Sequence, residues 1–195
     1  LLRFRDDARN EFYYKRNNCF YYDLETLLGG QAAKNDIDNF VNGSFVTLYL
    51  SPRDYHRVHM PYDGSLKKMI YIPGKLFSVN PFTISKIHNV FTRNERVVCM
   101  FRAKFGEMAV IFVGAMLVAG IKTTWAGQIT PSHKKEMIIW NYGEQDVNLK
   151  KGEEMGRFQF GSTVILLFPK KTVRWLDHLK VSGGVQLGQL LGRLY

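Results

Sequence analysis

The sequence contains only two cysteines, Cys19 and Cys99, which lie eighty residues apart without a C-x-x-C pair. A disulfide framework needs more cysteines, and a structural zinc site needs ligands at close spacing. Neither device is therefore expected to hold the fold together. So few cysteines suit a protein of a reducing compartment.

The sequence also lacks an apolar run long enough to cross a membrane. The longest, MAVIFVGAMLVAGI at residues 108–121, has fourteen residues, whereas a membrane-spanning helix needs roughly 20. We therefore expect this run in the protein core. The first residues, LLRFRDDARN, show no signal-peptide architecture. No internal repeat or low-complexity tract is visible.

What is present favours one folded domain over residues 1–195. Hydrophobic residues make up 46% of the chain and aromatic residues 14%, which is enough for a proper core. Lys and Arg number 27 against 17 Asp and Glu, so the formal net charge is +10. Such a charge favours anionic partners: lipid headgroups, phosphorylated substrates or nucleic acid.

The pattern of apolar and turn-forming residues predicts short strands with few helices. Residues 44–51 (SFVTLYLS) and 67–74 (KKMIYIPG) read as strands, and residues 95–116 read as a hairpin. Residues 22–40 predict short helices broken at Gly29-Gly30. We expect a mostly β fold of the α+β class, a sandwich or barrel-like domain with a few short helices.

One candidate stretch is QFGSTVILLFP, residues 159–169. Gly161, Ser162 and Thr163 stand directly before five apolar residues that read as a buried strand. The simplest interpretation is a turn that leads into the strand, with both hydroxyl groups bonded to nearby backbone. The other interpretation is that Ser162 is a nucleophile held on a rigid support.

A second candidate stretch is YLSPRDYHRVHMPYDG, residues 49–64, which places Asp54, His56 and His59 within six positions. Histidine is the side chain best suited to proton transfer near neutral pH. The H-x-x-H spacing lacks a third ligand, so it predicts no metal site. Taken alone, both histidines are better explained as structural or surface residues.

Five segments, taken together, carry a resemblance to a known family. They occur in this order: YLSPRDYHRVHMP, NVFTRNERV, FGEMAVIFVGAMLVAGI, KGEEMGRF and FGST. The series resembles the phosphatidylserine decarboxylases of the bacterial and mitochondrial type. The resemblance covers nearly the whole chain, from about Tyr22 to the last residue.

The resemblance implies a carboxy-lyase that is made as a zymogen and cleaves itself between Gly161 and Ser162. The products would be a β chain of residues 1–161 and an α chain of residues 162–195. Ser162 would become a covalent pyruvoyl group, the cofactor of the enzyme. That group would form a Schiff base with phosphatidylserine and accept electrons while carbon dioxide leaves, giving phosphatidylethanolamine.

The resemblance also implies roles for the two histidines. His59 would be the activating histidine of a triad similar to that of serine proteases, and would take the proton of Ser162. His56 would act as a second acid or contact the substrate headgroup.

The triad aspartate of the family belongs to an Ala-Asp-Gly-like block upstream of the histidines. The equivalent position falls just before Leu1, as does the family's membrane-associating segment. Asp6 and Asp7 lie close by, but their context does not match, and Asp54 is a poor substitute in sequence terms. We therefore expect the chain itself to lack the triad aspartate, which puts its activity in question.

The expected partners are phosphatidylserine, an anionic membrane surface and the α and β chains of the same precursor, with a homo-oligomer left open. The expected location is peripheral, on the cytoplasmic side of a bacterial inner membrane or on the mitochondrial inner membrane. Nucleic acid is not expected, because a basic nucleic-acid-binding barrel needs neither the histidine block nor FGST. The main alternative is an uncleaved relative that binds anionic lipid, in which residues 161 and 162 remain joined. A metal hydrolase that uses His56 and His59 is a further alternative.

Overall fold

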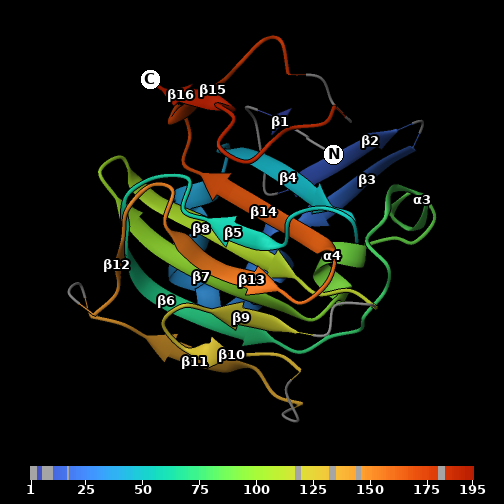
Figure 1. Ribbon diagram of the computed structural model, residues 1–195, viewed down its shortest axis with the longest axis horizontal. Helices are drawn as coiled ribbons and strands as arrows, with labels where there is room; N and C mark the ends of the chain where they lie inside the picture. The colour runs from blue at the N-terminus through green and yellow to red at the C-terminus, as the bar shows by residue number, and fades with distance from the viewer. Residues whose placement is uncertain are drawn as a thin grey trace.

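The computed structural model describes residues 4–5, 11–16, 18–116, 120–131, 135–143, 146–179 and 183–195. An eight-stranded sheet and a four-stranded sheet face each other, with short helices at one side (Figure 1). All strand pairs are antiparallel. The predicted mostly β fold with a few short helices is confirmed.

The larger sheet has the strand order β1-β4-β14-β8-β7-β6-β11, with β12 paired to β6. Its strands are β1 (Phe4–Arg5), β4 (Ser44–Leu50), β6 (Gly64–Ile72), β7 (Arg96–Ala103), β8 (Gly106–Val113), β11 (Ile138–Asn141), β12 (Asn148–Leu149) and β14 (Ser162–Phe168). The strand predicted at 44–51 and the hairpin predicted at 95–116 are confirmed. The strand predicted from residue 67 begins earlier, because Gly64 and Ser65 pair with β12.

The smaller sheet has the order β10-β9-β13-β5. Its strands are β5 (Arg57–His59), β9 (Ile121–Thr123), β10 (Gly127–Gln128) and β13 (Glu154–Phe158). It packs on the larger sheet through aromatic contact, since the rings of Phe112 on β8 and Phe158 on β13 have centroids 5.3 Å apart. Two further pairs are β2 (Glu11–Arg16) with β3 (Asn18–Asp23), and β15 (Val173–Trp175) with β16 (Gly192–Leu194).

The helices are short and belong to two groups, one in residues 24–40 and one in residues 81–93. They are α1 (Leu24–Leu28), η1 (Gly30–Ala33), α2 (Lys34–Ile37), η2 (Asp38–Phe40), α3 (Pro81–Ile84) and α4 (Val90–Arg93). Asp23 caps α1 by accepting a hydrogen bond from the Thr26 N–H at 2.7 Å. Gly29 ends α1 with a φ of 107°, a conformation that favours glycine. The predicted break at Gly29 is thus confirmed.

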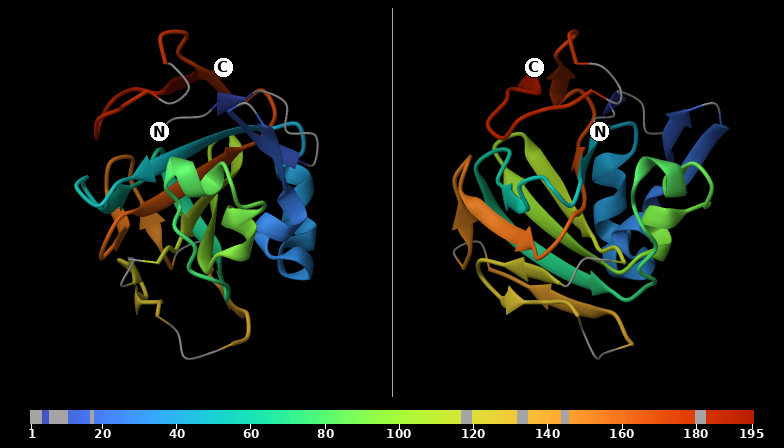
Figure 2. Two further views of the ribbon diagram at one scale, coloured as in Figure 1. Left: turned by 90° about the vertical axis from the view of Figure 1, so that its right-hand side faces the viewer. Right: turned by 45° about the vertical axis from the view of Figure 1, so that its right-hand side comes forward.

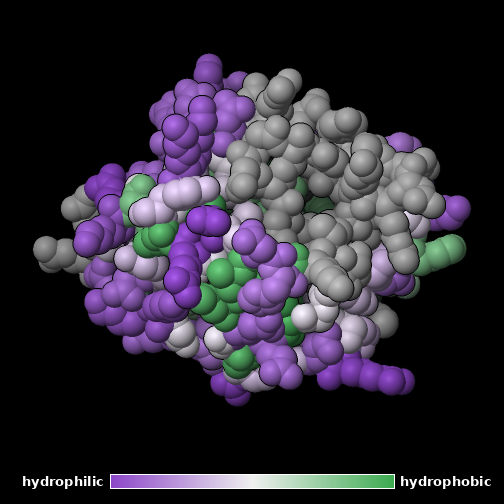
Figure 3. Space-filling model, turned by 90° about the horizontal axis from the view of Figure 1, so that it is seen from above, coloured by the Kyte–Doolittle hydropathy of each residue, from purple (hydrophilic) through white to green (hydrophobic). Residues whose placement is uncertain are grey.

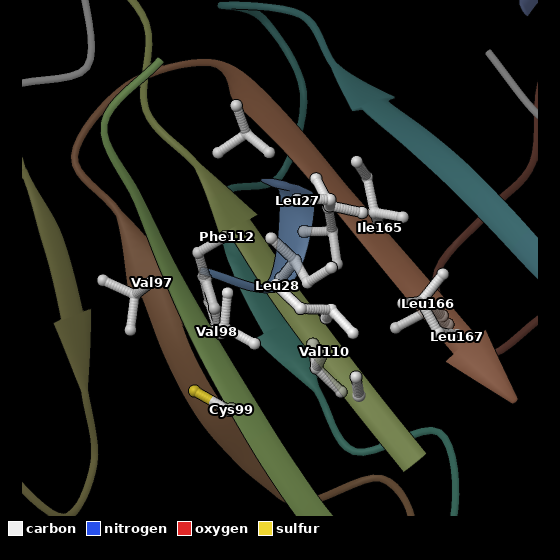
Figure 4. Close-up of a cluster of buried hydrophobic side chains, with 14 of the residues drawn as sticks. Leu27, Leu28, Val97, Val98, Cys99, Val110, Phe112, Ile165, Leu166 and Leu167 are labelled. Atoms are coloured by element: carbon white, nitrogen blue, oxygen red, sulfur yellow. The ribbon is translucent and has the colours of Figure 1, made fainter. Parts of the chain in front are cut away.

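The larger sheet is covered on both faces, which explains why β14 is a continuous buried run and not an alternating one. Val98, Ile111 and Ile165 are neighbours across β7, β8 and β14. Figure 4 shows Leu27 and Leu28 of α1 beside Ile165 and Val98 on this face. The smaller sheet covers the opposite face, so the side chains on both faces of the larger sheet are shielded from water.

The long apolar run at 108–121 is a core strand in its first part, as predicted. Residues 108–113 are wholly buried in β8. Met116 departs from the prediction, because 67% of its surface is exposed. Residues 117–119 of the run lie outside the described residues.

No helix in the described ranges is long and apolar enough to cross a membrane. Seen from above, much of the described surface is hydrophilic, with a smaller hydrophobic area in a hollow (Figure 3). Cys99 is a buried free thiol on β7, and burial raises its pKa above the usual range. It is therefore a core residue rather than a reactive one.

Candidate functional site

Ser162 is the first residue of β14, in the middle of the larger sheet. It pairs with Leu50 of β4, and its side chain is wholly buried. Its hydroxyl donates a hydrogen bond to the backbone carbonyl of Val113, the last residue of β8. The turn into a buried strand and the backbone hydrogen bond predicted for Ser162 are confirmed, but the one predicted for Thr163 is wrong, because its buried side-chain oxygen has no hydrogen-bond partner among the described residues. Strand pairing and this hydrogen bond together fix the position of the hydroxyl oxygen.

Gly161 lies against the end of β4, where no larger residue fits. A Cβ atom at this position would lie 2.7 Å from both the Leu50 carbonyl oxygen and the Pro52 nitrogen. Contacts this short with backbone cannot be relieved by a side-chain rotation. The close approach therefore explains why glycine precedes Ser162, and it leaves the carbonyl group of Gly161 adjacent to the serine.

His56 lies near the Gly161–Ser162 bond. Its Nε2 atom is 3.3 Å from the Pro52 carbonyl oxygen, and its ring stacks on Phe160 with centroids 6.2 Å apart. Its Nδ1 atom is buried and has no hydrogen-bond partner among the residues that the structure describes. His56 thus contacts Phe160, which precedes Gly161, and Pro52, which packs against Gly161.

His59, on β5, has partners at both ring nitrogens. Nδ1 lies 2.7 Å from the Gly152 carbonyl oxygen, and Nε2 lies 2.9 Å from the Tyr55 hydroxyl. Because a carbonyl can only accept, Nδ1 of the neutral ring carries the proton and Nε2 accepts from Tyr55. In the described structure neither nitrogen bonds Ser162. The structure therefore brings His56, and not His59, into contact with the residues around Ser162, and the predicted role of His59 stays a prediction.

The strand pair β5–β13 positions His59. His59 is opposite Glu154 in the register, and Glu154 forms ion pairs with Arg57 at 2.7 Å and with Arg157 at 2.8 Å. Burial raises the pKa of Glu154, but the hydrogen bond from Arg57 and the charge of Arg157 outweigh it, so the pKa is lowered overall. The carboxylate stays charged near neutral pH and ties β5 to β13.

Asp54 does not orient either histidine ring. Its carboxylate accepts a hydrogen bond from the Ser51 N–H at 2.7 Å and closes the turn after β4. This backbone hydrogen bond, followed by one from the Ser51 side chain, lowers the pKa of Asp54. The atom that orients His59 is instead the Gly152 carbonyl. The other two candidates, Asp6 and Asp7, lie outside the described residues.

A pocket lies beside Gly161, between three segments that are distant in the sequence. It is lined by Tyr49, Pro52, Ser78, Val79, Asn80, Ala115, Met116 and Gly161. Burial, followed by the charge of Asp54, raises the pKa of Tyr49, so its hydroxyl stays protonated. The pocket borders the backbone of Gly161, next to Ser162. In the described ranges no group of three or more His, Cys, Asp or Glu side chains could hold a metal.

Asn94 joins two walls of this pocket and was not identified from the sequence. The side chain is wholly buried. Its amide nitrogen donates to the carbonyls of Phe77 and Gly114, both at 2.8 Å, and its oxygen accepts from the Phe77 N–H at 3.0 Å. Phe77 directly precedes the 78–80 wall, and Gly114 directly precedes Ala115. The only sequence signal was its place in the motif NVFTRNERV.

Comparison with known proteins places these features in a family context. The family model described as phosphatidylserine decarboxylase matches residues 7–193. The chain is 55% identical over 172 residues to the phosphatidylserine decarboxylase proenzyme of Haemophilus influenzae, covering 88% of this chain and 59% of the relative. It is 52% identical over 176 residues to that of Glaesserella parasuis, covering 89% and 59%. It is also 52% identical over 171 residues to that of Vibrio cholerae, covering 86% and 59%. The chain thus spans less than two thirds of the length of these relatives.

Proposed function

Because this chain belongs to the phosphatidylserine decarboxylase family, we propose that it converts phosphatidylserine to phosphatidylethanolamine after cleaving itself between Gly161 and Ser162. The observation that carries the proposal is the placement of Ser162. A wholly buried serine begins a central strand, follows a glycine that has no room for a Cβ, and stands beside a pocket. This arrangement supports an attack by the Ser162 hydroxyl on the carbonyl carbon of Gly161.

In the proposed cleavage, the Ser162 hydroxyl attacks the Gly161 carbonyl carbon and the amide bond becomes an ester. Elimination then releases the Gly161 carboxylate, and hydrolysis of the remaining dehydroalanine yields the pyruvoyl group and ammonia. The hydroxyl proton, which points to the Val113 carbonyl in the uncleaved chain, must move to a base. A serine hydroxyl is a weak nucleophile until a base removes this proton.

We assign the base to His59 and a second acid or headgroup contact to His56. The proton on Nδ1 of His59 is held by the Gly152 carbonyl, so Nε2 is the basic nitrogen. A carbonyl here does the orienting work that an aspartate does in the serine-protease triad. Because Nε2 bonds Tyr55 and not Ser162, the transfer needs a water molecule or a movement of the exposed segment 52–55.

The site fits the proposed cofactor. The pyruvoyl group supplies a ketone that binds the substrate amine and withdraws electrons as carbon dioxide leaves. Ser162 would hold it next to Gly161, which lines the pocket. The Tyr49 hydroxyl, protonated at neutral pH, is a donor on the pocket wall. The charge of +10 supports peripheral work at an anionic membrane surface.

The decisive experiment is an intact-mass spectrum of the denatured protein. We expect two species that match residues 1–161 and 162–195, with pyruvoyl in place of serine at position 162. Ser162→Ala should give one uncleaved species and no decarboxylation, while folding stability falls by only about 1 kcal/mol because one hydrogen bond is lost.

The matched control is Ser44→Ala, which removes another buried serine, at the start of β4 beside β14. This variant should cleave normally. A single species of 22.6 kDa from the unaltered chain would refute self-cleavage and leave an uncleaved relative.

A further inference from the structure

Three large apolar side chains stand exposed around the pocket beside Gly161. The exposed fractions are 43% for Leu76, 73% for Phe82 and 67% for Met116. Single exposed apolar residues are ordinary, but a group of them around a functional pocket marks an interaction site. None of the three side chains is buried in the fold, so all three can contact a partner.

The local structure fixes these side chains at the pocket mouth. Leu76 lies beside Gly114, two residues before Met116. Asn80 lines the pocket and caps α3 by accepting from the Thr83 N–H at 2.7 Å, which places Phe82 in the first turn of that helix. The left view of Figure 2 looks directly at the side of the molecule that carries α3 and α4.

The sequence segments that carry these side chains are basic. No Asp or Glu occurs in residues 64–94 or in residues 108–135, the segments that contain Leu76, Phe82 and Met116. Lys75 and Lys86 are exposed, and within the described ranges neither has an ion-pair partner. Glu95 is the acid nearest Leu76, and its carboxylate accepts a hydrogen bond from the Tyr71 hydroxyl at 2.9 Å. Apolar side chains that can enter a lipid interface, carried on otherwise basic segments, match an anionic bilayer.

We propose that Leu76, Phe82 and Met116, with Lys75 and Lys86, form a docking face that rests on an anionic phospholipid bilayer. The pocket beside Gly161 then opens onto the lipid headgroups, and a substrate amine reaches position 162 without leaving the membrane. This inference rests on the proposed function for its purpose, but the binding itself can be tested without any decarboxylation.

The binding test uses sedimentation with phosphatidylcholine vesicles, with and without phosphatidylglycerol. We compare the double variant Leu76→Ser/Phe82→Ser with the matched control Met137→Ser/Ile139→Ser, whose residues are exposed by 39% and 45% on and beside β11, an edge strand. Loss of the two apolar anchors should lower partitioning by about tenfold or more. The control should bind like the unaltered protein.

Charge is tested separately with Lys75→Gln and Lys86→Gln. Each should weaken binding to phosphatidylglycerol vesicles by about fivefold at low salt, and less at high salt. Pure phosphatidylcholine vesicles should show little difference between these variants and the unaltered chain.

The catalytic test compares two forms of the substrate. For Leu76→Ser/Phe82→Ser, the ratio of turnover in vesicles to turnover of dispersed short-chain phosphatidylserine should fall by about tenfold, in step with partitioning. An unchanged ratio would overturn the proposal.

Three other results would also overturn the docking face. One is equal vesicle binding by the double variant and the unaltered chain. Another is an equal loss in the Met137→Ser/Ile139→Ser control. The third is a lipid-free dimer that the double variant converts to a monomer, because the face would then belong to a second copy. Failure of the proposed function appears differently, as vesicle binding that responds to the variants in a protein that never cleaves.

Discussion

The proposed nucleophile, Ser162, and the proposed base, His59, are held in place by very different contacts. Ser162 lies inside the larger sheet, paired with Leu50 of β4 and hydrogen-bonded to Val113 of β8, with no exposed surface. His59 lies on a three-residue strand of the smaller sheet, held by two side-chain hydrogen bonds and a partly exposed ion-pair cluster. The first position is fixed by the core, and the second by a few polar contacts.

Because of this difference, changes in the two regions should affect folding stability and proton transfer to different degrees. A change near Ser162 removes packing or buried hydrogen bonds, so it should alter folding as well as cleavage. A change near the histidines should alter proton transfer while the fold persists. The exposed segment 52–55 lies between β4 and β5 and outside both strands, so a movement there, one of the two routes proposed for the proton transfer, would leave the sheets intact.

The largest effect is expected for His59→Ala. Removing a general base lowers a rate by about 10²–10⁴, so the uncleaved chain should persist in a time course followed by mass spectrometry. The free energy of unfolding, measured with urea, should fall by only about 1 kcal/mol, because the lost hydrogen bonds are near the surface.

The control for His59→Ala is His178→Ala, which alters an exposed histidine and should cleave at the normal rate. Normal cleavage by His59→Ala, with slow cleavage by His56→Ala, would transfer the role of base to His56.

The next effect is expected for Asn94→Ala, on the buried side of the comparison. Three backbone groups of Phe77 and Gly114, one in a buried and two in part-buried hydrogen bonds, lose their partner. This should lower the free energy of unfolding by about 3 kcal/mol. Asn141→Ala, on an exposed position of β11, is the control and should be close to neutral. If Asn94→Ala unfolds like the unaltered protein, the two pocket walls are held by other contacts.

The smallest effect is expected for Glu154→Gln, and it depends on pH. The pKa of Glu154 is lowered in the folded protein, so its stabilising contribution is present above the unfolded value of about 4.5 and is lost as the pH falls through the folded value. Near neutral pH the variant should be less stable by under about 1 kcal/mol, since the ion pairs are partly exposed. Urea unfolding at several pH values should show the difference vanish in acid. A constant difference would assign the effect to packing.

Much of the fold could be predicted from the residues, because periodicity and apolar content act locally. The strand at β4, the β7–β8 hairpin and the break at Gly29 all follow from short-range preferences. The strand β14 could be predicted from the sequence, because burial on both faces of the sheet produces a continuous apolar run. The early start of β6 was not readable, because it depends on pairing with β12, more than eighty residues away.

Only those candidate site residues whose side chains have recognisable chemistry could be identified from the sequence. Ser162, His56 and His59 were found because hydroxyl and imidazole groups have recognisable uses. The Gly152 carbonyl that orients His59 has no sequence signature, since every residue has such a group. The pocket was also hidden, because residues 78–80 and 115–116 meet Gly161 only in three dimensions.

The central place of β14 has a consequence for the molecule after a break at Gly161–Ser162. The new end would begin a strand that remains hydrogen-bonded along both edges, to β4 and to β8. Two polypeptides would then share one sheet and one core, and neither could leave without exposing the interior. Their separation would be unimolecular but their reassembly bimolecular, so the cleaved protein would refold less readily at high dilution than the uncleaved chain. The contacts that hold the folded form together would be the same in both.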